Sequence, residues 1–177
     1  TILTGLVGFS VWLHHMFIVG MSEMAMSFFS AGSMRISIFT AVQVFAWIAT
    51  IWSGRPVLTA AMYFALGSIA LLVIGGLSGV FTGIIPVDWQ VHNTYYVVAH
   101  IHYVLIGSNV FPVFAGAYYW LPKMIGKTLN ERLGKWSFWV MFVGFNVGFF
   151  PMHILGLLGM PRRIFTYPAG LGLDGMN

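Results

Sequence analysis

The 177-residue sequence predicts an all-α membrane protein, a polytopic bundle of five transmembrane helices. Hydrophobic residues make up 59% of the chain and charged residues only 7%, whereas about a quarter of an average soluble domain is charged. The mean hydropathy is +0.87, and apolar runs longer than about 18 residues recur along the chain. Because lipid cannot satisfy the backbone of an open strand, each run is expected to be a helix.

The expected spans are residues 1–20, 34–53, 57–85, 94–121 and 136–159, each near the length of about 20 residues that a bilayer requires. A polar turn at 22–33, a short link at 54–56, a loop at 86–93 and a basic stretch at 122–135 are expected to connect them. No repeat or linker interrupts residues 1–177, which we interpret as a single membrane domain.

The first span lacks a basic n-region, an initiator methionine and a cleavage site, so it is not a signal peptide. Its residues resemble the interior of a helix and not its start, so we expect the chain to be a fragment of a longer subunit.

In the third span Gly75, Gly79 and Gly83 repeat every four residues, and Gly144 and Gly148 do so in the fifth span. This spacing brings membrane helices into close contact. Prolines interrupt the fourth and fifth spans and are expected to kink them. These prolines are Pro112 and Pro151.

Basic residues predict the orientation of the bundle. Arg35 is the only basic residue in the two connections on one side, which is therefore expected to be the outer side. The connections on the other side, expected in the cytoplasm or matrix, carry Arg55, Lys123, Lys127, Arg132 and Lys135. The net charge of +4 is small and scattered, so nucleic acid binding is not expected. The chain has no cysteine, so any metal must be held by histidine or oxygen ligands.

Three of the six histidines, His92, His100 and His102, lie in the stretch V-H-N-T-Y-Y-V-V-A-H-I-H-Y-V-L at residues 91–105. Residues two apart on a helix point about 200° apart, so His100 and His102 cannot bind the same metal ion. They can each hold a different redox centre, and imidazole is a usual axial ligand of haem iron. The alternative is two polar side chains hydrogen-bonded within a helix bundle.

Adjacent histidines, His14 and His15, lie in W-L-H-H-M-F at residues 12–17, at the depth expected for His100. Two further imidazoles there would complete a cluster suited to copper and iron, although hydrogen bonds to backbone or water are the alternative. His153 is also within a span, and we interpret it as structural.

Arg162 and Arg163 follow the last span at the outer surface, where topology least favours positive charge. Guanidinium groups bind carboxylates in bidentate fashion. We therefore expect an anionic partner such as haem propionates, with a lipid phosphate as the alternative.

These two stretches, together with F-F-P-M-H-I-L-G-L-L-G-M-P-R-R at residues 149–163, resemble subunit I of the haem-copper oxidases, specifically cytochrome c oxidase. The resemblance covers essentially the whole chain and implies the seventh to eleventh of about twelve membrane helices. It implies that His14 and His15 bind copper, that His100 is the axial ligand of a high-spin haem, and that His102 is an axial ligand of a low-spin haem. His92 and Asn93 would help bind magnesium or manganese near the outer surface, and Arg162 and Arg163 would hold the propionates.

The sequence also departs from the family pattern. The third copper-binding histidine, in H-P-E-V-Y, and the second low-spin haem ligand are absent, so this chain alone cannot assemble either site. Asn93 stands where the family has an aspartate, and Ile101 stands where it has a phenylalanine. Gln43 occupies the position of the lysine of one proton pathway.

The resemblance implies an enzyme that reduces dioxygen to water and couples this reaction to proton translocation, in a bacterial plasma membrane or the mitochondrial inner membrane. Its partners would be the remaining part of subunit I, an electron-accepting subunit II, cytochrome c or quinol as donor, dioxygen and the lipid bilayer. Two alternatives are a nitric oxide reductase of the same superfamily and a non-redox proton transporter that uses membrane histidines.

Overall fold

A computed structural model describes residues 2–166, 170 and 172, and these residues form an all-α bundle with no β-strand among them. Helix α1 (Ile2–Val11) continues into a 3₁₀ segment, Trp12–Met16. Helices α2 (Glu23–Ser53) and α3 (Ala60–Gly83) follow, then the short α4 (Ile85–Val91). Helix α5 (Tyr95–Leu105) passes through a π-helical segment, Ile106–Val110, into α6 (Phe111–Ile125), and α7 (Glu131–Leu157) completes the bundle.

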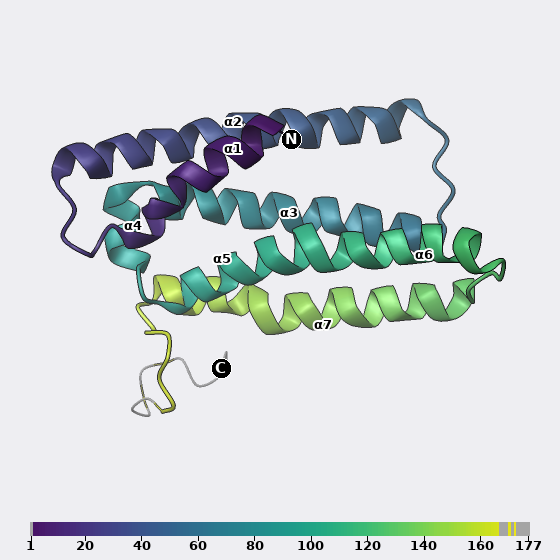
Figure 1. Cartoon of the computed structure of the whole chain (residues 1–177). Coiled ribbons are helices and arrows are strands. Elements are labelled where there is room, and N and C mark those ends of the chain that lie inside the picture. The colour runs from purple at the N-terminus through teal and green to yellow at the C-terminus, as the bar shows by residue number, and fades with distance from the viewer. Residues whose placement is uncertain (1, 167–169, 171, 173–177) are drawn as a thin grey trace.

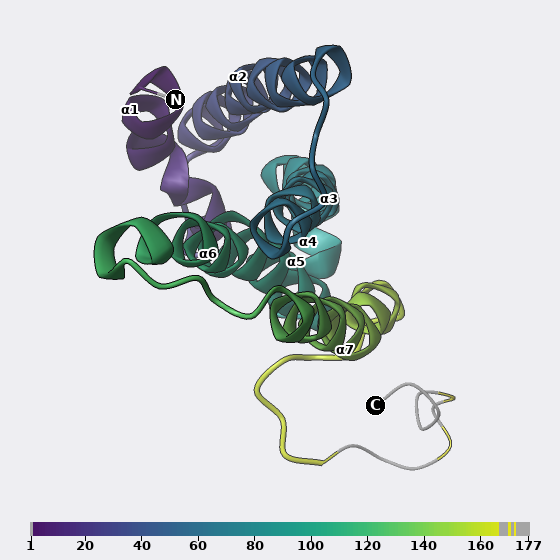
Figure 2. The same ribbon diagram turned by 90° about the vertical axis from the view of Figure 1, so that its right-hand side faces the viewer.

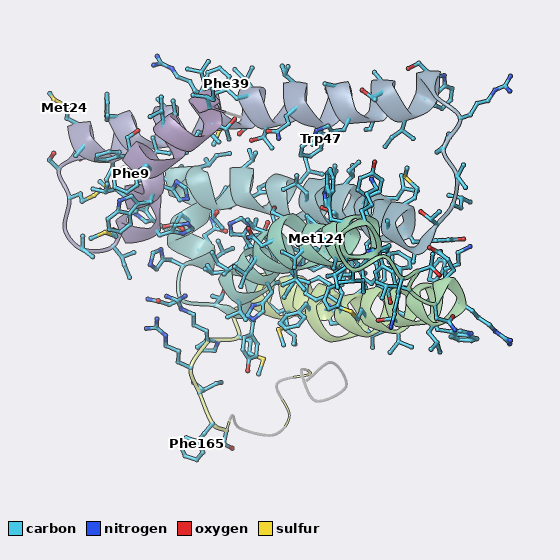
Figure 3. All side chains as sticks on the ribbon, turned by 45° about the vertical axis from the view of Figure 1, so that its right-hand side comes forward. Phe9, Met24, Phe39, Trp47, Met124 and Phe165 are labelled. Atoms are coloured by element: carbon cyan, nitrogen blue, oxygen red, sulfur yellow. The ribbon has the colours of Figure 1, made fainter. Side chains whose placement is uncertain are left out.

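Four helical stretches are long and apolar enough to cross a membrane, namely α2, α3, α5 to α6 and α7, while the stretch 2–16 is shorter. Apolar side chains cover the outer surfaces of the helices, α1 included. Phe9 on α1, Met24 on α2 and Met124 on α6 are each about 80% exposed (Figure 3). Such surfaces are stable against lipid or other membrane helices, so the protein is an integral membrane protein.

The expected polar turn at 22–33 was wrong, because α2 begins at Glu23. Ser22 caps this helix, its hydroxyl accepting a hydrogen bond from the Ala25 N–H at 3.3 Å. Consequently Arg35 lies within the helix, about 18 Å from its start at helical rise, and not in a connection. The expected loop at 86–93 was also wrong over most of its length, because α4 occupies Ile85–Val91 with a proline in its first turn.

The other basic residues lie at one end of the bundle, as predicted, but most of the expected connection at 122–135 is helix. Lys123 lies in α6, and Arg132 and Lys135 lie in α7, so only Arg55 and Lys127 are in connections. Figure 1 shows the α2–α3 and α6–α7 connections together at that end, and α4 and residues 158–166 at the other.

At this basic end Glu131, in the first turn of α7, accepts a hydrogen bond from the Ala60 N–H at 2.7 Å. This bond satisfies a free N–H at the start of α3 and joins α3 to α7.

Helix α3 is the centre of the bundle and lies between α2 on one side and α5, α6 and α7 on the other (Figure 2). An aromatic core fills the space between α3 and these last three helices, and its buried members are Phe64, Leu71, Tyr103, Phe111 and Phe138. A buried serine also joins α3 to the π segment, since the Ser68 hydroxyl donates to the Gly107 carbonyl at 2.6 Å.

The glycine spacing in α3 does bring helices into close contact. A Cβ on Gly75 would lie 2.9 Å from the Val104 nitrogen, and a Cβ on Gly79 would lie 2.7 Å from the His100 ring. Gly83 faces Ser33 in the same way, at 3.1 Å. For Gly144 and Gly148 the prediction was wrong within the described part of the chain, because a Cβ there would meet nothing within 4 Å.

Pro112 lies in the first turn of α6, directly after the π segment, so the missing N–H falls where the helical hydrogen-bond pattern already changes. Pro151 lies inside α7, which continues through it to Leu157.

Replacing Gly156 by alanine is expected to destabilise the protein, because a Cβ there would lie 1.9 Å from the Tyr96 nitrogen and 2.5 Å from its Cα. These are backbone atoms, so no side-chain rotation relieves the overlap, and the cost should reach or exceed about 3 kcal/mol. The thermal midpoint of the complete detergent-solubilised protein measures it. Gly144→Ala, on the same helix, is the matched control and should leave the midpoint unchanged or higher. Equal midpoints for the two variants would contradict the prediction.

Candidate functional site

The two adjacent histidines lie in the 3₁₀ segment after α1 and turn toward each other. The Nε2 atoms of His14 and His15 are 3.0 Å apart, and the rings are tilted by 56°. Imidazole nitrogens bind metal ions such as zinc at about 2 Å, so two nitrogens 3.0 Å apart fit two ligands of one ion. The Nδ1 atom of His14 points the other way, to the Ser33 hydroxyl on α2 at 2.9 Å.

His100 is buried between α5 and α3. Its Nδ1 is 2.9 Å from the Gly75 carbonyl oxygen and 3.2 Å from the Ser78 hydroxyl. A carbonyl only accepts, so Nδ1 carries the proton and Nε2 keeps a free lone pair. The His15 ring is stacked 6.3 Å away. The imidazoles of the 3₁₀ segment and of α5 are therefore neighbours, as the sequence predicted.

His102 lies on the opposite side of α5, against α7. Its Nδ1 donates to the Val98 carbonyl of its own helix at 2.7 Å, and its ring stacks on Phe149 with the centroids 4.3 Å apart. This confirms that His100 and His102 face different helices. For both, the Nδ1–H bonds to a backbone carbonyl, the arrangement that orients a metal-binding histidine and raises the basicity of Nε2. Both side chains thus fit the role of axial haem ligand.

A cavity of about 140 Å³ with both polar and apolar walls lies at the end of the bundle near α4. It is lined by His15, Asp88, His92, Val97, Ile101 and Arg162. Asp88 is 2% exposed, and its carboxylate accepts a hydrogen bond from His92 Nδ1 at 2.7 Å. Burial raises the pKa of Asp88, while the hydrogen bond and the charge of His92 oppose the rise.

Asp88 was not among the residues predicted from the sequence to lie in the site. A signal was present, because Asp88 is one of only four acidic residues in the chain and stands four positions before His92.

Asn93 holds Arg162 in place at the edge of this cavity. The Arg162 N–H donates to the Asn93 carbonyl at 2.9 Å, and its guanidinium donates to the Asn93 side-chain oxygen at 3.0 Å. Asn93 has φ +60°, a left-handed conformation that asparagine tolerates. Its side-chain oxygen is therefore engaged by a cation, which weakens the fit of Asn93 as a magnesium ligand.

The Arg162 Nε is buried and, within the described residues, has no hydrogen-bond partner. Burial and the neighbouring Arg163 lower the pKa of Arg162, so an anion in contact with it would be favourable. Arg163 is exposed, with φ +65°.

His153 on α7 packs among aromatic rings, with Tyr96 and Tyr103 centroids 5.3 Å and 5.2 Å away. Its Nδ1 is 3.3 Å from the Phe150 carbonyl, a weak contact. Gln43 lies half-buried on α2, on the same side as Thr40. Across residues 2–166, 170 and 172, no three histidine or acidic side chains are close enough to hold a metal ion by themselves.

The sequence matches the family described as cytochrome c and quinol oxidase polypeptide I over residues 1–177. It is 47% identical to cytochrome c oxidase subunit 1 of Alkalihalophilus pseudofirmus over all of this chain and 28% of the relative. In Bacillus subtilis two proteins are similar to it. One is cytochrome c oxidase subunit 1, 46% identical over 99% of this chain and 28% of the relative. The other is quinol oxidase subunit 1, 50% identical over 97% of this chain and 26% of the relative.

The chain spans less than a third of the length of these relatives. The match nevertheless extends from the first residue to the last, and it includes the histidine stretches around α5 and the 3₁₀ segment. The chain therefore belongs to the family of cytochrome c and quinol oxidase subunit I, within the haem-copper oxidases.

Proposed function

We propose that the complete protein is the catalytic core of a terminal respiratory oxidase, which reduces dioxygen to water and couples this reaction to proton translocation. The observation that carries the proposal is the pair of opposed imidazoles on α5. His100 faces α3 and has His15 stacked 6.3 Å away, whereas His102 faces α7. One rigid helix thus provides a ligand for each of two redox centres.

In this proposal His100 would hold the iron of the high-spin haem, and His102 would hold the iron of the low-spin haem. His14 and His15 would hold the copper ion. When bound, the haem iron and copper supply the redox chemistry on dioxygen. The protein residues would hold and orient these groups, because the Nδ1 hydrogen bonds of His14, His100 and His102 fix the orientation of each ring and do not involve Nε2.

Arg162 and Arg163 would bind the haem propionates, and the unpartnered Nε of Arg162 within the described chain supports an anion there. A magnesium or manganese ion at His92 and Asn93 would need further ligands, since the Asn93 oxygen accepts from Arg162. The buried Asp88 carboxylate, which is hydrogen-bonded to His92, would be one such ligand.

The remaining part of subunit I would supply the third copper ligand and the second low-spin haem ligand. An electron-accepting subunit II would deliver electrons from cytochrome c or a quinol. The cytochrome c oxidase and the quinol oxidase of Bacillus subtilis have similar sequence identities to this chain, 46% and 50%. Activity assays of the purified complex with each donor would therefore decide between the two donors.

Replacing His102 by alanine in the complete protein should abolish the low-spin haem band in reduced-minus-oxidised spectra while carbon monoxide still binds the high-spin haem. His100→Ala should have the reverse effect, because the two imidazoles face different helices. Loss of both signals in both correctly folded variants would contradict separate assignments.

Replacing either His14 or His15 by alanine should remove most of the copper and most of the oxygen consumption while both haems remain. An ion held by few imidazoles is bound weakly when one is lost. Elemental analysis and haem spectra on the same samples measure this effect. The copper assignment fails if copper content and turnover are unchanged.

Gln43 replaces a lysine of the family pattern, and an amide cannot carry a proton by changing its charge. The same side of α2 carries Ser33, Ser37 and Thr40 at intervals of four and three residues, and these hydroxyls together with bound water support a proton path without a fixed charge. We expect the complete enzyme to turn over, and Gln43→Lys to change the rate of haem-copper reduction by less than about tenfold, or ~1.4 kcal/mol. Stopped-flow reduction measures this rate. A many-fold increase from a nearly inactive parent would contradict the prediction.

A further inference from the structure

Ser33 is a buried serine within the transmembrane helix α2, and its side chain contacts His14, one of the two adjacent histidines of the 3₁₀ segment. It lies on α2, is 8% exposed, and is 2.9 Å from His14 Nδ1. Close packing holds it there on two sides. A Cβ on Gly32 would lie 2.7 Å from Val11, and a Cβ on Gly83 would lie 3.1 Å from the Ser33 Cβ.

The hydrogen bonds of Ser33 have a defined direction. Its hydroxyl is 2.6 Å from the Phe29 carbonyl oxygen, one turn earlier on α2. A carbonyl has no proton to give, so the single proton of the hydroxyl is used in this bond. The Ser33 oxygen can therefore only accept from His14, and Nδ1 of His14 must carry the proton in this contact.

With Nδ1 protonated, the neutral His14 ring has its lone pair on Nε2, the nitrogen that faces His15 Nε2 at 3.0 Å. The opposite tautomer would place a proton where a metal ion has to bind. It would also leave Ser33 and His14 facing each other with lone pairs alone in an apolar setting, which is costly.

We infer that Ser33 is a positioning residue for the copper site, accepting from Nδ1 of His14 so that Nε2 of His14 is directed, unprotonated, at the shared ion. This inference rests on the proposed function, because it takes His14 and His15 as copper ligands. Nothing in the spacing of the sequence marks Ser33, which is 19 residues from His14.

The test uses the complete, assembled oxidase carrying Ser33→Ala, Ser33→Thr or Ser30→Ala. Each variant is titrated with increasing concentrations of a copper chelator, and the copper that stays bound is measured. Ser33→Ala should retain copper about 10- to 100-fold more weakly, the usual effect of losing such an outer hydrogen bond, with both haem bands intact. Ser33→Thr keeps a hydroxyl that can bond the carbonyl four residues earlier, and it should retain copper as the parent does.

Ser30→Ala is the matched control. It removes another α2 hydroxyl, one that donates to the Gly83 carbonyl at 2.7 Å and therefore joins α2 to α3 without touching His14. Equal copper retention in Ser33→Ala and the parent would overturn the inference. Equal losses in Ser33→Ala and Ser30→Ala would also overturn it, because helix packing would then explain both.

If Ser33→Ala does not assemble with haem, the isosteric pair Ser33→Thr and Ser33→Val tests the role of Ser33, because threonine has a hydroxyl where valine has a methyl group. Equal copper affinity in that pair would refute the role of Ser33. A parent complex that assembles with haem but holds no copper would instead refute the proposed function, so the two failures are distinguishable.

Discussion

The site depends on one constraint, which is that a polar atom inside an apolar bundle must find its hydrogen-bond partner within the protein. Four histidines meet this constraint with Nδ1: His14 on Ser33, His92 on Asp88, His100 on Gly75 and His102 on Val98. The partners are a hydroxyl, a carboxylate and two backbone carbonyls. In each case the hydrogen bond holds the ring in one orientation and does not involve the other ring nitrogen, Nε2.

Close helix contact makes these bonds geometrically feasible. The Gly75 carbonyl is reached by His100 only because α3 has no side chain at positions 75 and 79, where a Cβ would lie within 3 Å of α5. Gly83 and Gly32 allow the same close contact around Ser33, between α2 and α3 and between α2 and the end of α1. Helix α3 is thus the common support of the bundle, and the imidazoles on either side are positioned relative to its backbone.

At the end of the bundle near α4, the polar side chains form some hydrogen bonds with each other but do not satisfy all of their polar atoms. Asp88 and His92 satisfy one another, and Asn93 engages Arg162, whereas the Arg162 Nε has no partner among the described residues. A cavity of about 140 Å³ next to these groups provides room for a ligand or water. This end therefore differs from the aromatic core between α3 and α7, where the rings fill the space.

Local pattern was sufficient to predict the membrane class, the helical architecture and the opposite directions of His100 and His102, because composition and the 3.6-residue period act within one segment. It was insufficient where a residue's role is set by a distant segment. The stretch 22–33 looked polar but forms helix, since Ser22 caps it and α1 and α3 pack against it. Asp88 and Ser33 resembled ordinary polar residues, and only the fold brings Asp88 into the cavity beside His15 and Ser33 against His14. The sequence by itself determined which side chains could bind metal and haem. For His14 and His100 the tertiary structure alone decided which ring nitrogen is free, because their partners, Ser33 and Gly75, lie on other helices.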